Sequence, residues 1–98
     1  MSFEEEYEFH MLKNEAENMV IRELELQLKT GNERMCRCAD CVLDVAAMAL
    51  NAVKPWYRVS LLGALYASQA VTDKDYADSV KQAVHNAIRK VTDNPAHD

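Results

Sequence analysis

The first long amphipathic pattern runs from about Phe9 to Lys29, where apolar residues recur mostly at i+4 spacing. Ile21 and Leu26 widen this stripe to well over half of the helix circumference. We expect so broad an arc to contact both its own core and a second protomer, although core packing alone explains much of it. Gly31 is expected to end the helix as a left-handed cap. The stripe itself consists of Leu12, Ala16, Met19, Val20, Leu24 and Leu28.

A second helix is predicted from about Asp40 to Val53, before Pro55 blocks its continuation. It is apolar around nearly its whole circumference, which indicates a buried central helix. Only Asp44 and Asn51 interrupt the apolar surface, and their spacing of seven places them on one face. Because buried polar groups must be hydrogen-bonded, we expect them to bond backbone or partner groups and fix the packing, or else to contact a ligand.

The rest of the chain predicts an extended connector and two further helices. Trp56–Val59 forms the connector, and Ser60 can cap a third helix that runs to about Gln69. Thr72–Asp75 resembles a capping box that starts a fourth helix, which ends at Asn94-Pro95. The fold class is therefore all-α, a single small domain over residues 1–98 with about four helices around the buried one. Residues 1–8 and 93–98 are expected to be flexible ends.

Composition and charge narrow the functional classes. A chain of 98 residues with 49% hydrophobic residues can build one modest core and is not a disordered tail. Its formal charge of −5 argues against bulk nucleic-acid binding. The acidic start Met-Ser-Phe-Glu-Glu-Glu is unlike a signal peptide, and the uncharged stretch Val59–Thr72 is too short to span a membrane. We therefore expect a cytoplasmic protein without a membrane anchor.

The three cysteines lie within six residues, as Cys36-Arg37-Cys38-Ala39-Asp40-Cys41 at the start of the second helix. Zinc binds thiolates that converge on one point at about 2.3 Å, and the Cys38-x-x-Cys41 spacing is typical of a zinc knuckle. The positive end of the helix favours thiolates there. We predict a zinc ion held by Cys36, Cys38 and Cys41. The alternative is three buried or redox-active thiols without a metal, although no βαβ pattern of the thioredoxin type precedes them.

A tetrahedral site needs a fourth ligand, and the sequence leaves it open. His10 could approach from the first helix, His85 lies opposite the apolar stripe of its helix, and His97 is in the C-terminal tail. A carboxylate, a water or a residue of a second protomer also remains possible. No glutamate beside the cluster offers a general base, and no Ser-His-Asp, HExxH or phosphate-binding glycine pattern is present. We therefore expect a structural metal and no enzymatic activity.

The stretch Met35–Tyr57 resembles the late competence development protein ComFB family. The resemblance lies in CxCxxC, then x-Leu-Asp-Val, then Ala-Leu-Asn and Pro-x-Tyr. It implies an all-helical homodimer in which Cys36, Cys38 and Cys41 bind zinc. The family can complete its site with a further cysteine, which this sequence lacks. Some relatives are receptors for cyclic dinucleotides.

Two functional hypotheses follow. A small zinc-binding regulatory protein, as a receptor for a cyclic dinucleotide, needs cations for phosphates and aromatic surfaces for bases. Lys54, Trp56, Tyr57 and Arg58 supply both, and Arg37 could join them. The alternative for these residues is that the aromatic rings pack on the helices while the cations are solvated. The alternative function is a structural homodimeric protein-interaction module with no small-molecule ligand.

Overall fold

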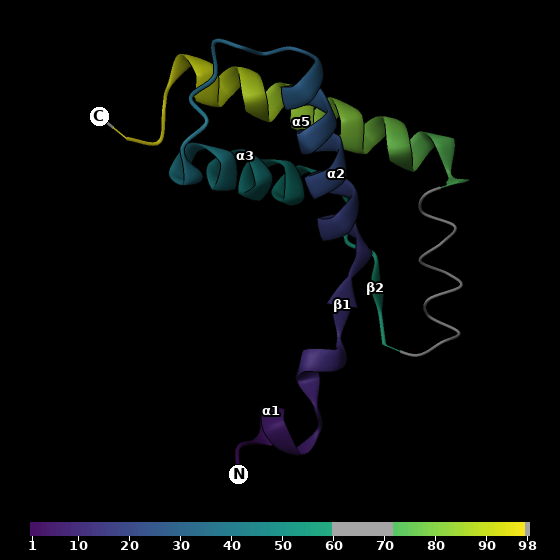
Figure 1. The fold of residues 1–98 in the computed structure, drawn as a ribbon. Helices are drawn as coiled ribbons and strands as arrows, with labels where there is room; N and C mark the ends of the chain where they lie inside the picture. The colour runs from purple at the N-terminus through teal and green to yellow at the C-terminus, as the bar shows by residue number, and fades with distance from the viewer. Residues whose placement is uncertain (60–71, 98) are drawn as a thin grey trace.

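The computed structural model describes residues 1–59 and 72–97 (Figure 1). The all-α prediction is confirmed, since the strands in these ranges are two antiparallel two-residue segments, with Lys13 opposite Arg58 and Asn14 opposite Tyr57. The helix predicted over residues 60–69 lies outside the described residues. In chain order the elements are α1 (Phe3–Glu6), the 3-10 helix η1 (Phe9–Met11), β1 (Lys13–Asn14), α2 (Glu15–Thr30), α3 (Ala39–Ala52), β2 (Tyr57–Arg58) and α5 (Lys74–Asp93).

The core lies where α2, α3 and α5 pack against one another (Figure 1). Each helix contributes a stripe of residues three or four positions apart, as its sequence pattern predicts. The stripe of α5 is the longest, and Asp73 starts this helix by accepting a hydrogen bond from the Tyr76 amide at 3.0 Å. The buried residues are Ala16, Val20 and Leu24 on α2, Cys41, Val45 and Ala49 on α3, and Tyr76, Val80, Ala83, Val84, Ala87, Ile88 and Val91 on α5.

Helix α2 begins at Glu15, six residues later than the predicted start at Phe9. The apolar pattern continues upstream, but Glu8 adopts a left-handed conformation (φ 52°) and Phe9–Met11 form only one 3-10 turn. The true start is the Asn14 cap, whose side-chain oxygen accepts a hydrogen bond from the Ala16 amide at 3.1 Å. A capping side chain therefore overrides hydrophobic periodicity here.

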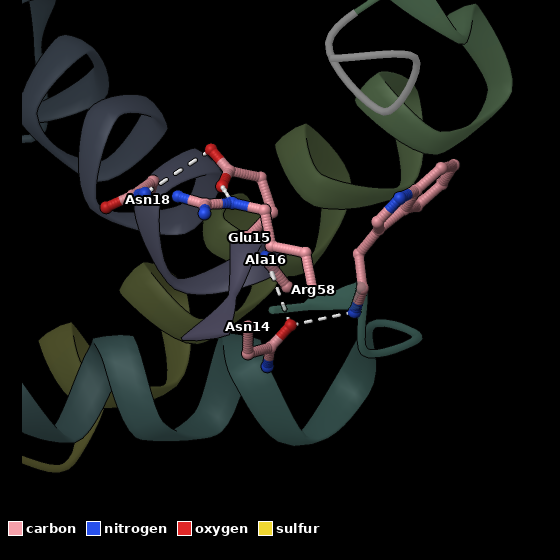
Figure 2. A network of polar contacts seen from close by, with 6 residues as sticks. Asn14, Glu15, Ala16, Asn18 and Arg58 are labelled. Atoms are coloured by element: carbon pink, nitrogen blue, oxygen red, sulfur yellow. Dashed lines mark hydrogen bonds and ion pairs between the residues drawn. The ribbon is translucent and has the colours of Figure 1, made fainter. Parts of the chain in front are cut away.

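Asn14 also fixes the predicted extended connector (Figure 2). The same Asn14 oxygen accepts a hydrogen bond from the Trp56 amide at 2.7 Å, and the Glu15 amide donates to the Trp56 carbonyl at 2.7 Å. Arg58 then pairs with the Glu15 carboxylate, with Nε and Oε2 3.2 Å apart. The connector that follows α3 is therefore bound to the first turn of α2.

Helix α3 is buried along one face only. Cys41, Val45 and Ala49 have no exposed surface, whereas Leu43 is 67% exposed. Asn51 is exposed and Asp44 only half-buried, so the pair predicted to be buried is not. The apolar sequence pattern thus extends over a surface that one chain leaves open to solvent.

The first twelve residues form an arm that extends away from the core (Figure 1). Within the arm, the ring centroid of Phe3 lies 4.8 Å from that of Tyr7 and 5.6 Å from that of Phe9. All three side chains nevertheless remain exposed. Among the described helices, none combines the length and the hydrophobicity needed to cross a bilayer.

Replacement of Asn14 by alanine tests the role of this cap. We expect N14A to lower the free energy of unfolding by about 2–3 kcal/mol, because α2 loses its N-cap and the Trp56 amide loses its acceptor. N14D keeps an acceptor oxygen and should recover most of this loss. Urea titrations followed by circular dichroism measure both, and a change below about 0.5 kcal/mol in N14A would contradict the assignment.

Candidate metal centre

Four potential metal ligands converge at one end of α3. The thiols of Cys36, Cys38 and Cys41 and a ring nitrogen of His97 all lie within 4.8 Å of one another. Cys36 and Cys38 lie in the loop between α2 and α3, Cys41 is in the first turn of α3, and His97 follows α5. No disulfide links the three cysteines. The structure therefore brings the three predicted ligands together and adds a fourth.

The start of α3 places two of the thiols. Cys38 is the N-cap residue, and its sulfur accepts a hydrogen bond from the Cys41 amide at 3.4 Å. The Val42 amide donates to the Cys38 carbonyl at 3.0 Å, which begins the helix. This is the tight turn that the Cys-x-x-Cys spacing predicts. Both sulfurs lie at the positive end of the helix, where negative charge is favoured.

Arg37 holds the preceding loop in place. Its guanidinium donates to the carbonyls of Leu28 at 3.0 Å, Gly31 at 3.2 Å and Asn32 at 2.9 Å. These are carbonyl groups at the end of α2 that lack helical partners. The left-handed residue is Asn32 (φ 61°) and not Gly31, whose backbone is extended, so the predicted glycine cap is wrong. Because Arg37 binds these backbone carbonyls, its side chain stabilises the loop that carries Cys36 and Cys38.

His97 is the fourth member of the cluster, and its ring Nε2 lies 3.2 Å from the Cys36 sulfur. Of the other two histidines, His10 lies in the N-terminal arm and His85 is exposed on α5. The sequence names all three but cannot choose among them. The choice depends on the packing of α5 against α3, which returns the C-terminal tail to the start of α3.

The surroundings shift the pKa values of two of the thiols in opposite directions. A hydrogen bond with His97, assisted by hydrogen bonds with Cys38, lowers the pKa of Cys36 from 9.0 to about 6. For Cys41, a hydrogen bond with the Ala96 backbone lowers the pKa, but burial and the two neighbouring thiols outweigh it and the pKa is raised. A metal ligand must be deprotonated, so Cys36 is prepared for binding, whereas Cys41 must release its proton when a cation arrives.

The donor set fits a metal ion. In a tetrahedral zinc site with bonds of about 2.3 Å to sulfur, neighbouring sulfur atoms lie about 3.8 Å apart. The four donor atoms of the cluster all lie within 4.8 Å of one another, which is close to this spacing. Cys₃His is also an established donor set for structural zinc. Cys36, Cys38, Cys41 and His97 could therefore hold a metal ion.

Of the candidate ligand-binding residues of the connector, Lys54 and Trp56 line a separate hollow of about 510 Å³, whereas Tyr57 and Arg58 do not line it. Trp56 packs edge-on against Tyr76, with ring centroids 4.9 Å apart, and the Tyr76 hydroxyl donates to the Lys54 carbonyl at 2.6 Å. Lys54 and Tyr57 have exposed side chains, whereas Arg58 is half-buried in its pair with Glu15. The packing alternative is thus realised for Trp56, while Lys54 and Tyr57 remain accessible.

Arg37 does not join these residues. It precedes α3, whereas the connector follows α3, and a helix of this length separates its ends by about 20 Å. Arg37 and the connector are close in sequence, but the rigid helix α3 between them holds them apart in space. Within one chain, a single ligand of modest size therefore cannot contact both.

Comparisons with known proteins identify the family and agree with the fold. Residues 13–95, most of the chain, match the model of the late competence development protein ComFB family. A solved structure described as the late competence protein ComFB from Bacillus subtilis has a similar fold, with a TM-score of 0.70. It is 24% identical over 86% of this chain and 91% of that one. No curated protein matches the chain. The predicted resemblance is therefore confirmed, and this chain belongs to the ComFB family.

Proposed function

We propose that this chain is a non-catalytic binding protein whose fold is completed by one zinc ion and whose connector receives a cyclic dinucleotide. The observation that carries the zinc assignment is the convergence of Cys36, Cys38, Cys41 and His97 within 4.8 Å. Three thiolates and an imidazole suit zinc better than magnesium or calcium, which prefer oxygen ligands.

The position of the cluster supports a structural role for the zinc. It would join the α2–α3 loop, the start of α3 and the tail after α5, which are distant in sequence. Zinc sites in small domains contribute on the order of 10 kcal/mol of binding free energy that is available to folding. Four protein donors would also fill a tetrahedral shell, which leaves no open position for a reacting water. The donor set therefore favours stabilisation over catalysis.

The connector supports the binding role. A cyclic dinucleotide has two phosphates and two flat bases, so it needs cationic groups and stacking surfaces close together. Lys54 and Trp56 line the hollow and offer a cation and an aromatic ring, and the neighbouring Tyr57, which does not line it, offers an exposed ring. Asp75, which also lines the hollow, could accept hydrogen bonds from base N–H groups. This arrangement suits a ligand that presents both phosphate and base.

Removal of the Tyr57 ring tests the ligand assignment. We expect Y57A to weaken binding of the cognate cyclic dinucleotide at least about fivefold, since stacking on one aromatic ring contributes about 1–3 kcal/mol per base. Tyr7, which is similarly exposed on the arm, provides the matched control Y7A. Isothermal titration calorimetry with guanine- and adenine-containing cyclic dinucleotides gives the affinities. Failure of the zinc-loaded wild-type protein to bind any of them would refute the receptor function.

Loss of the imidazole tests the metal site. We expect H97Q to bind zinc on the order of tenfold or more weakly, because only three protein donors remain. H85Q, on the exposed face of α5, should bind zinc as the wild type does. Competition with a chromophoric chelator measures the affinity, and the visible spectrum of the cobalt form reports the ligand set. Equal affinities and spectra in H97Q and wild type would exclude His97 as a ligand.

A further inference from the structure

We propose that Cys38 and Cys41 form a reversible disulfide at the start of α3, and that a peroxide which forms this disulfide removes the metal ion from the cluster. The two cysteines therefore serve both as metal ligands and as a site of oxidative modification. The release of the metal rests on the zinc site proposed above, whereas the disulfide requires only the geometry of α3.

The first turn of α3 places Cys38 and Cys41 at a separation that a disulfide can bridge. Cys38 is the N-cap residue, and Cys41 follows three residues later in the first turn. Positions three residues apart in a helix have Cα atoms about 5 Å apart, and a disulfide spans Cα separations of about 4.4–6.8 Å. The two sulfur atoms lie within 4.8 Å of each other, and the Cys38 sulfur already accepts a hydrogen bond from the Cys41 amide at 3.4 Å. Formation of the bond therefore requires side-chain rotation and little movement of the backbone.

The two cysteines differ in their access to solvent. Cys38 is partly exposed, whereas Cys41 has no exposed surface. A small oxidant such as hydrogen peroxide can therefore reach Cys38, and Cys41 lies beside it as the thiol that completes the disulfide. In the metal-bound cluster both thiols are deprotonated, because a metal ligand must lose its proton, and the thiolate is the form that attacks an oxidant.

The oxidation proceeds in two steps. The Cys38 thiolate attacks one oxygen atom of hydrogen peroxide, the O–O bond breaks, and Cys38 becomes a sulfenic acid while hydroxide leaves. The Cys41 thiolate then attacks the Cys38 sulfur, so that the S–S bond forms and the S–O bond breaks with loss of a second hydroxide. The two thiolates have lost two electrons and the peroxide has gained them, and each hydroxide takes a proton from the solvent. A dithiol reductant reverses the change by thiol–disulfide exchange.

The oxidised cluster has too few donors to retain zinc. Only the Cys36 thiol and the His97 imidazole remain outside the disulfide, whereas a structural zinc site needs four protein donors. The start of α3 is preserved, because the disulfide lies within its first turn and Cys41 stays in the core. The link that is lost joins the α2–α3 loop to the tail that carries His97. Oxidation therefore removes the contribution of the metal to stability without requiring α3 to unfold.

Treatment of the zinc-loaded full chain with hydrogen peroxide tests both parts of the proposal. A chromophoric zinc chelator measures the metal before and after treatment, and we expect release of nearly all the bound zinc and renewed binding after reduction with dithiothreitol. Cleavage by trypsin separates Cys36, in peptide 35–37, from the other two cysteines, in peptide 38–58. Iodoacetamide should therefore label peptide 35–37 of the oxidised chain and leave peptide 38–58 unlabelled, with a mass that lacks the two thiol hydrogens.

Two serine variants identify the reacting pair. C36S keeps both cysteines of α3, so peroxide should form the disulfide within peptide 38–58 as in the wild type. C38S keeps the N-cap, since a serine hydroxyl also caps a helix, but should form a disulfide at least about tenfold more slowly because Cys36 and Cys41 do not share a helical turn.

Two results would overturn the proposal. One is zinc that stays bound under peroxide, and the other is a disulfide that links peptide 35–37 to peptide 38–58. Absence of zinc from the untreated chain would refute the metal site and with it the release of the metal, whereas the peptide masses decide independently whether the disulfide forms.

Discussion

The position of α3 is fixed at both of its ends by segments that are distant in sequence, and the rest of the structure depends on this constraint. At its start, Cys38 and Cys41 lie beside His97 from the tail after α5. At its end, the connector is bound by Asn14 at the start of α2 and by Tyr76 on α5. Between these ends, Cys41, Val45 and Ala49 are buried in the core. The polar and sulfur contacts at the ends therefore add directional constraints to this apolar packing.

The sequence predicts the helices well because the apolar residues of each recur at the spacing of one helix face. The stripe of α5 and its Asp73 cap follow directly from residue spacing. The start of α2 is not predicted correctly, since the apolar pattern begins upstream and includes Leu12, whereas the Asn14 cap starts the helix only at Glu15. Periodicity reports which residues favour an apolar surface, but not whether one chain supplies that surface. This distinction explains both the exposed Leu12 of the arm and the exposed Leu43 of α3.

Some residues of the candidate metal site can be predicted from local sequence spacing, whereas others depend on the tertiary fold. The three cysteines are found from sequence because a loop and one helical turn bring them together, and neither requires knowledge of the tertiary fold. His97 requires that knowledge, as α5 must first pack on α3 before its tail can return to the cluster. Arg37 shows the converse error. Its charge and its proximity to the connector in sequence favour a ligand contact, whereas the carbonyls of Leu28, Gly31 and Asn32, in and just after the last turn of α2, bind its guanidinium.

The hydrophobic core and a metal ion bound at the cluster would stabilise different parts of the structure. The buried side chains of α2, α3 and α5 form one cluster that includes Cys41, whereas Cys36 and Cys38 lie at its edge and His97 is exposed. A metal ion bound there would add little apolar burial. Its contribution would instead be to join the α2–α3 loop, which Met35 already anchors in the core, to the C-terminal tail. Because the loop sets the start of α3, a metal ion bound there would also stabilise the first turn of that helix.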